Sequence, residues 1–278
     1  ITEKGNASGS AFKFPNTVYN AAGGYLSICS GIKGYNVTVT NGAQSGLASM
    51  AYAMSVLRSG QENAMLATGS DENSDIMTEL FDKLGVTSEK VVAPFAGNDG
   101  FVLSDGSASV LIEDEKSAKE RGARIYCHVT GYGMAHSNVK FGTLTGSEAG
   151  LTNAVNNALA DAGMTIDDID AVFGFANGMK AVDDVEIKGL TAVFGDKLAE
   201  KPVVELKEVL GESRAAAATT AAAHAALMFA GKIPSQEAYS IATDGSVSKT
   251  NVEASKLNNV LVAAYGAGGS YTAIVLSK

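Results

Sequence analysis

The segment Asn36-Val37-Thr38-Val39-Thr40-Asn41-Gly42-Ala43-Gln44-Ser45-Gly46-Leu47 joins a β-branched run, a turn of small residues and the start of an apolar helix. The run at 36–40 predicts a short strand, and the turn at 41–43 follows it directly. The helix should end near Ser59-Gly60. Its buried face is predicted by apolar residues at helical spacing, namely Leu47, Met50, Ala51, Met54 and Leu57.

The same order of strand, turn, small-residue helix and glycine-rich hairpin is predicted twice, in segments 36–112 and 203–276. In the first segment, a strand at 64–67 follows the helix, and a hairpin is expected at 100–112 around Asp105-Gly106. We therefore expect the two segments to superpose as related halves.

The second copy begins with a strand at 203–206 and turns at Gly211. An alanine-rich helix at 215–229 and a hairpin at 260–276 complete it. Helices this rich in Ala and Gly carry too little charge for a surface position. We expect this helix and the helix at 44–58 to pack side by side between sheets.

The segment between the two copies alternates helices with a strand. An amphipathic helix should carry Leu151, Val155 and Leu159 and end near Gly163. A strand at 170–174 and a helix at 183–193 should follow, which favours a mixed α/β sheet.

Composition limits the class of protein. The chain has 278 residues, of which 46% are hydrophobic and 18% charged, which is typical of a globular α/β protein. The net charge of −9 argues against a nucleic-acid surface, and no apolar run is long enough to span a membrane. Only two cysteines occur, Cys29 and Cys127, without a C-x-x-C pattern. They predict no disulfide scaffold and favour the cytoplasm.

Several short motifs follow one another in a fixed order between residues 31 and 269. They are Gly31–Gly34, 42–47, Leu57–Gly60, Pro94-Phe95, 99–103, Asp105-Gly106, 118–123 and Gly268-Gly269. Together they resemble the β-ketoacyl synthases of fatty-acid and type II polyketide assembly. The resemblance covers most of the chain.

The resemblance implies a thiolase-like α/β fold, layered αβαβα, with two related halves. These halves would be residues 1–165 and 166–278, joined in one structural unit. Because the chain begins shortly before the 42–47 motif, it resembles an N-terminally shortened member whose first half is incomplete at its start.

In the resembled family, the 42–47 motif is a nucleophile elbow that places a Cys at a helix N-terminus. There the helix dipole lowers the thiol pKa and backbone N–H groups form an oxyanion hole. An ungapped match puts Ala43 at that position, and a methyl group cannot attack a thioester. Gln44 is the other candidate, because chain length factors often carry Gln there, and it would then plug the acyl tunnel.

The two catalytic histidines of the family are also replaced. Asn177 stands in the first position and Glu212 in the second, after the run that begins at Lys207. Lys207 either supports the site electrostatically or forms an ion pair with Glu212. The other family positions that are retained are Asp183, Glu186, Gly268 and Gly269. The histidines that do occur, at 128, 136 and 224, fall outside the matched positions, and neither a metal nor a cofactor is expected.

The resemblance therefore implies a non-catalytic, chain length factor-like subunit of a type II polyketide synthase, with the aryl polyene type as the finer assignment. It would pair with an active β-ketoacyl synthase in a heterodimer or heterotetramer, shape the acyl tunnel, and meet an acyl carrier protein through the complex. Apolar residues before the elbow would join the interface, namely Tyr19, Tyr25, Leu26 and Ile28. One alternative is an enzyme of altered chemistry, a decarboxylase or thioesterase that uses Asn177 and Glu212. Another is an engineered Cys-to-Ala synthase.

Overall fold

The computed structural model describes residues 12–140 and 144–278. The chain divides into two compact units, and the boundary between them lies between Thr40 and Asn41. The first unit holds a 3₁₀ turn, η2 (Phe14–Thr17), and helix α1 (Ala21–Ser30). Helix α1 ends at Gly31, whose φ of 65° is the left-handed conformation common after helices. The four apolar residues expected at an interface are all exposed in this unit: Tyr19, Tyr25, Leu26 and Ile28.

The strand predicted at residues 36–40 is wrong. This segment is extended but joins no sheet ladder, and Val37 is exposed. The β-branched alternation favours an extended backbone, but a strand also needs a partner edge, and residues 36–40 pair with none of the described strands.

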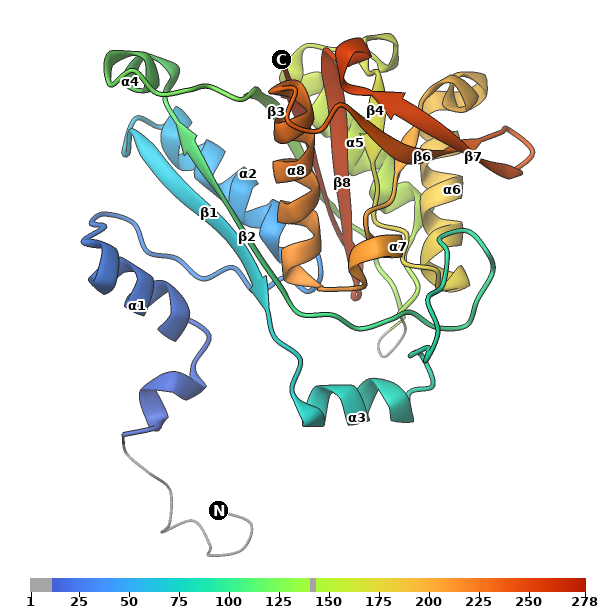
Figure 1. The fold of residues 1–278 in the computed structure, drawn as a ribbon, viewed down its shortest axis with the longest axis horizontal. Helices are drawn as coiled ribbons and strands as arrows, with labels where there is room; N and C mark the ends of the chain where they lie inside the picture. The colour runs from blue at the N-terminus through green and yellow to red at the C-terminus, as the bar shows by residue number, and fades with distance from the viewer. Residues whose placement is uncertain (1–11, 141–143) are drawn as a thin grey trace, which may run out of the picture. The chain divides into compact units, whose positions relative to one another are not determined.

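Two helices form the centre of the second unit, α2 (Ser45–Arg58) and α8 (Ala215–Phe229). They pack against each other between two sheets, as predicted (Figure 1). Gly46 shows how close the backbones are. A Cβ placed there would lie 2.2 Å from the Thr219 hydroxyl and 2.3 Å from the Ala215 carbonyl oxygen. This contact between the helices therefore requires glycine at position 46.

One face of the helix pair is covered by a two-stranded antiparallel sheet, β1 (Ala64–Asp71) and β2 (Gly106–Glu113). The hairpin predicted at 100–112 is wrong, because β2 pairs with β1, placing Leu111 opposite Leu66. Phe101 and Leu103 form only isolated bridges, and Leu103 meets Glu212. The apolar run of β2 pairs with β1, which is also apolar and lies earlier in the chain. Residues 100–103 lie next to the polar network described below, where Leu103 bridges to Glu212.

The other face of the pair is covered by a seven-stranded mixed sheet in the order β3-β9-β8-β4-β5-β6-β7. Strands β8 and β9 form the predicted hairpin, and β4 pairs in parallel with both β5 and β8. The bounds are β3 His128–His136, β4 Ala171–Phe173, β5 Val203–Val204, β6 Ser235–Ile241, β7 Val247–Glu253, β8 Asn259–Gly266 and β9 Ser270–Ser277.

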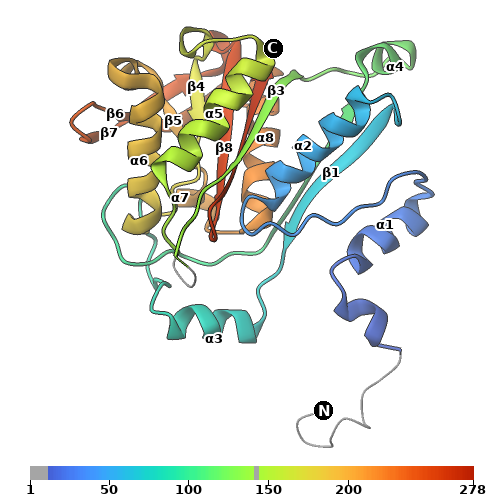
Figure 2. The ribbon, with the colours of Figure 1, turned by 180° about the vertical axis from the view of Figure 1, so that it is seen from behind.

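An outer helical layer covers the far face of this larger sheet (Figure 2). It contains α5 (Glu148–Ala162) and α6 (Lys180–Phe194), close to the predicted ranges, and α5 ends at Gly163. The remaining elements are connections: α3 Asp75–Lys83, α4 Glu115–Glu120, α7 Lys207–Leu210, η3 Ile166–Asp168, η4 Gly195–Glu200 and η5 Ala254–Lys256.

Residues 41–278 thus supply four layers in the order sheet, helices, sheet, helices. Helix α2 precedes the antiparallel pair β1 and β2, and α8 precedes the antiparallel pair β8 and β9, although β6 and β7 come between α8 and β8. That the two halves superpose, and that they divide after residue 165, stay predictions. Within the described ranges, no helix is long and apolar enough to cross a membrane.

Candidate functional site

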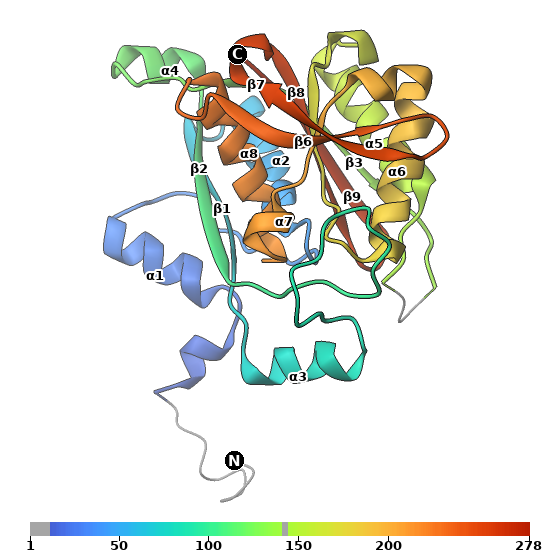
Figure 3. The same cartoon turned by 45° about the vertical axis from the view of Figure 1, so that its right-hand side comes forward.

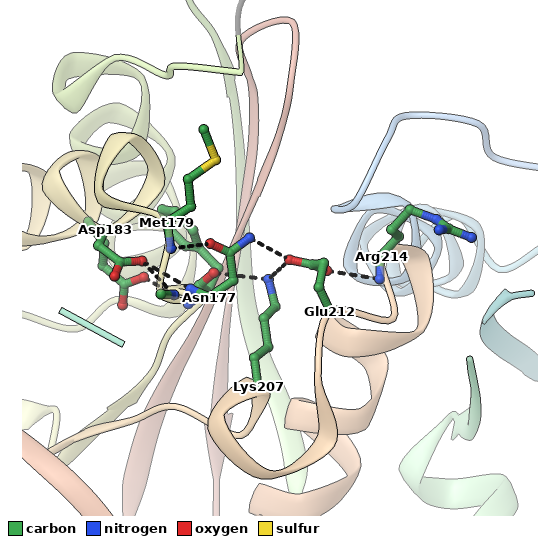
Figure 4. A network of polar contacts seen from close by, with 9 residues as sticks. Asn177, Met179, Asp183, Lys207, Glu212 and Arg214 are labelled. Carbon is green, nitrogen blue, oxygen red and sulfur yellow. Dashed lines mark hydrogen bonds and ion pairs between the residues drawn. The ribbon is translucent and has the colours of Figure 1, made fainter. Parts of the chain in front are cut away.

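A buried polar network lies where β4 ends, between the start of α6, the short helix α7 and the turn before α8 (Figure 4). Asn177 follows β4 and is 7% exposed, and Glu212 precedes α8 and is 5% exposed. The Asn177 Nδ2 group donates a hydrogen bond of 2.9 Å to Glu212 Oε2. The two residues predicted to replace the family histidines are therefore in direct contact.

Each polar atom of these two side chains has a partner within the protein. Asn177 Oδ1 accepts a bond of 3.1 Å from the Met179 N–H. Glu212 Oε2 also accepts from Lys207 Nζ at 2.7 Å, and its Oε1 accepts from the Arg214 N–H at 2.9 Å. These bonds fix both side chains in place, because moving either one would leave a buried polar group without its partner.

Lys207 forms the ion pair with Glu212 that the sequence left open. Its Nζ also donates to the Phe175 carbonyl oxygen at 2.9 Å. The two side chains are only 12% and 6% exposed. A buried pair of this kind requires both partners, because either charge alone would be desolvated without compensation.

Asp183, in the first turn of α6, holds the backbone around the network. Its Oδ1 accepts from the N–H groups of Asn177 and Gly178, at 3.0 and 3.2 Å. Its Oδ2 accepts from the Phe95 N–H at 2.6 Å. Burial raises the pKa of this carboxyl, and the three backbone donors oppose that rise.

Two residues with strained backbones border the network, and sequence reasoning missed both features. Among described residues, the non-glycine residues with positive φ are Phe95, at 64°, and Arg214, at 47°. Arg214 is held by Asp71, whose Oδ2 accepts from its Nε at 2.9 Å, and by Asn73. A strained backbone of this kind persists where the surrounding contacts hold it in place, and such residues are common at functional sites.

The side chains of Ala43 and Gln44, the two candidates for the nucleophile position, lie in different surroundings. Ala43 lines a void of about 20 Å³ together with Phe175 and Lys207, and Lys207 is the network residue that reaches this void. Gln44 is fully buried on another side, where its Oε1 accepts from the Thr272 hydroxyl of β9. The void has room for about one water molecule and none for an acyl chain.

The predicted glycine loop is the turn between β8 and β9, and it lies beside the elbow. A Cβ on Gly42 would be 3.5 Å from the Gly266 Cα. Gly268 and Gly269 have φ of 104° and 87°, and a Cβ on Gly269 would meet the Ser137 carbonyl oxygen at 2.2 Å. The structure therefore requires glycine at this turn.

A second acid pair lies beneath the network, formed by Glu186 of α6 and Glu205 just after β5. Both are buried, and one oxygen of each lies 1.9 and 2.0 Å from the point that a Gly174 Cβ would occupy. Burial raises the pKa of both, and the charge of Glu186 raises that of Glu205 further. The raised pKa of Glu205 favours its protonated form beside Glu186. Glu186 was predicted and Glu205 was missed, although a Glu directly after two buried valines was a readable signal.

The histidines lie outside the network. His128 and His136 are the ends of β3, and His136 contacts the Ser270 hydroxyl. His224 lies within α8 against Phe173, and burial lowers its pKa. In the part of the chain that the structure describes, no cluster of three or more His, Cys, Asp or Glu side chains could hold a metal.

Comparison with known proteins places the chain in a family. Residues 1–118 match the family model "Beta-ketoacyl synthase, N-terminal domain", and residues 126–240 match "Beta-ketoacyl synthase, C-terminal domain". The chain belongs to the β-ketoacyl synthase family, and its layered structure is the thiolase-like ketosynthase fold.

Individual relatives agree with this assignment. The chain is 29% identical to 3-oxoacyl-[acyl-carrier-protein] synthase 2 of Vibrio cholerae over 204 residues, which cover 70% of this chain and 49% of the relative. It is 30% identical to nodulation protein E of Rhizobium leguminosarum bv. trifolii over 202 residues, covering 71% and 49%. The chain thus spans about half the length of these curated relatives.

Solved structures give the same fold. The ishigamide ketosynthase/chain length factor matches with a TM-score of 0.82 and 25% identity, covering 94% of this chain and 65% of that one. A type II polyketide ketosynthase in complex with its acyl-carrier protein (AntDE:AntF) matches with a TM-score of 0.87 and 19% identity, covering 98% and 70%.

Proposed function

We propose that this chain is the non-catalytic, chain length factor-like partner of an active β-ketoacyl synthase, and that it shapes the acyl tunnel of their complex. The observation that carries the proposal is the closed network at the elbow. Ala43 offers no nucleophile, Asn177 and Glu212 bond each other and Lys207, and the remaining void is about 20 Å³. In this proposal Ala43 is the equivalent of the family nucleophile, because it faces the void and Gln44 does not.

The electrostatics of the site support the same proposal. Condensation needs donors that stabilise a developing oxyanion. Glu212 brings an anion to that place, and its charge already binds Lys207 at 2.7 Å. The enzyme alternative, a decarboxylase or thioesterase, would have to act through Asn177 and Glu212 while both are held by the hydrogen bonds described above.

The partners follow from the relatives. One structural neighbour is a ketosynthase/chain length factor, and another is a ketosynthase bound to its acyl-carrier protein. By analogy, this chain would form a heterodimer or heterotetramer with an active synthase that supplies the working site. The carrier protein would approach through that complex. The aryl polyene type stays a prediction of the sequence.

Co-expression tests the proposed partnership. The full chain would be produced alone and with a candidate ketosynthase, then compared by affinity capture and gel filtration. We expect a stoichiometric complex with the ketosynthase. As a matched control, a ketosynthase that forms a homodimer in fatty-acid synthesis should not be retained. A chain that stays monomeric and monodisperse beside every candidate would contradict the proposal.

A further inference from the structure

A groove of about 900 Å³ opens along the second halves of α2 and α8, beside β2. Its floor is apolar and includes Met50, Met54, Leu57, Val110, Ala222 and Ala226. Its volume lies within the roughly 300–1,000 Å³ of small-molecule pockets.

The groove is separate from the polar network. Ala226 is about 16 Å further along α8 than Ala215, where the network ends, at 1.5 Å per residue. Figures 1 and 3 show α4, which borders the groove, at the opposite end of the central helices from α7.

The groove gathers the arginines of an acidic chain. The net charge is −9 and only four arginines occur, at positions 58, 121, 124 and 214. Three of them, Arg58, Arg121 and Arg124, line this groove. Guanidinium groups around an apolar floor are the arrangement expected for a ligand with an apolar body and an anionic end.

Two of these arginines are already neutralised. Arg58 pairs with Asp161 at 2.8 Å, and Arg121 pairs with Glu113 at 2.7 Å. Glu113 also lines the groove, so its charge is balanced within the protein.

Arg124 differs from them. It stacks 5.1 Å over the ring of Tyr126, and its one hydrogen bond is a long one, 3.4 Å, to the Ala230 carbonyl oxygen. No carboxylate of the described residues pairs with it. The other acids of the groove are committed, because Asp114 accepts the first N–H groups of α4 and Glu115 pairs with a lysine of that helix. Arg124 therefore presents a guanidinium with unused donors at the edge of the apolar floor.

We propose that this groove binds a long-chain alkyl carboxylate, with the chain between α2 and α8 and the carboxylate on Arg124. The planar guanidinium fork matches a carboxylate, and Arg124 is exposed at the edge of the groove, where its unused donors can orient the ligand. The site is independent of the proposed partnership, since it uses none of the residues of the network.

The test is calorimetric titration of the full chain with dodecanoate below its micelle concentration. We expect saturable binding of one molecule per chain. Arg124→Gln should weaken it about 3- to 5-fold, the size expected for losing one exposed ion pair. Ala226→Phe should block the floor and weaken it as well. Lys188→Gln, which removes an exposed cation on α6, is the matched control and should bind like the unaltered chain.

Dodecan-1-ol separates recognition of the carboxylate from simple apolar contact. It should bind about 3- to 5-fold more weakly than dodecanoate to the unaltered chain, and as tightly as dodecanoate to Arg124→Gln. Absence of saturable binding would overturn the proposal, as would equal affinities of the unaltered chain and Arg124→Gln. Equal binding of alcohol and carboxylate would also overturn it, and the groove would then be an apolar surface for a protein segment. Circular dichroism of each variant checks that the fold is intact.

Discussion

The stability of the fold should depend on Lys207 and Glu212 being present together, because each charge compensates the other in a buried place. In Lys207→Met the apolar stem is kept, but Glu212 stays 5% exposed with no counter-charge. Removing one partner of a buried ion pair costs about 3–5 kcal/mol of unfolding free energy. Replacing both residues, as in Lys207→Met/Glu212→Gln, removes both charges and should cost less than the lysine replacement alone.

A double-mutant cycle measures this dependence. Urea unfolding of the full chain, followed by circular dichroism, gives the unfolding free energy of each variant. We expect a coupling energy of about 2–3 kcal/mol between the two positions, at the upper end of the usual range for residues in one network. The control is Lys197→Met, which removes an exposed ion pair with Asp167 and should cost at most about 1 kcal/mol. A Lys207→Met variant no less stable than Lys197→Met would refute the reasoning.

Two further predictions concern proton uptake and helix packing. Burial and the charge of Glu186 raise the pKa of Glu205 in the folded state. Above the ordinary pKa of a glutamate, the unfolded chain has released this proton while the folded chain still holds it. The free energy of unfolding should therefore fall as the pH rises through the folded-state pKa. Glu205→Gln should flatten this decline in urea unfolding from pH 5 to 9, whereas Glu200→Gln, at an exposed position, should leave it unchanged. Equal slopes in all three proteins would contradict the raised pKa of Glu205. Gly46→Ala should lower stability by about 1–3 kcal/mol or more by overpacking the helix pair. Gly24→Ala in α1 has open space and should not destabilise, so similar thermal melting of the two variants would contradict the packing model.

The elements that the sequence predicts correctly are those with strong local patterns. The central helices α2 and α8, the amphipathic helix α5 and the hairpin of β8 and β9 all form within a few residues of their predicted bounds. The errors concern pairing. Residues 36–40 have the composition of a strand but no partner, and β2 pairs with β1 across a long connection rather than with residues 100–103.

The candidate site was predictable where a motif order exists and was missed where contacts are long-range. Asn177, Lys207 and Glu212 are brought together as the resemblance implies. The clamp between Arg214 and Asp71 joins residues 143 positions apart, and no local pattern announces it. The contacts of Glu205 were not predictable either, because the burial of a carboxylate at a strand end depends on helices from other parts of the chain.

The central claim is that this chain belongs to a condensing complex without catalysing condensation itself. It is tested most directly by assaying carbon–carbon bond formation in a purified complex of this chain with its partner ketosynthase, in which only the partner's nucleophilic cysteine is replaced by alanine. The account predicts an intact complex with no condensation and, by intact-mass spectrometry, no acyl adduct on this chain. Condensation that persists in that complex, or an acyl group mapped to residues 41–47, would contradict it.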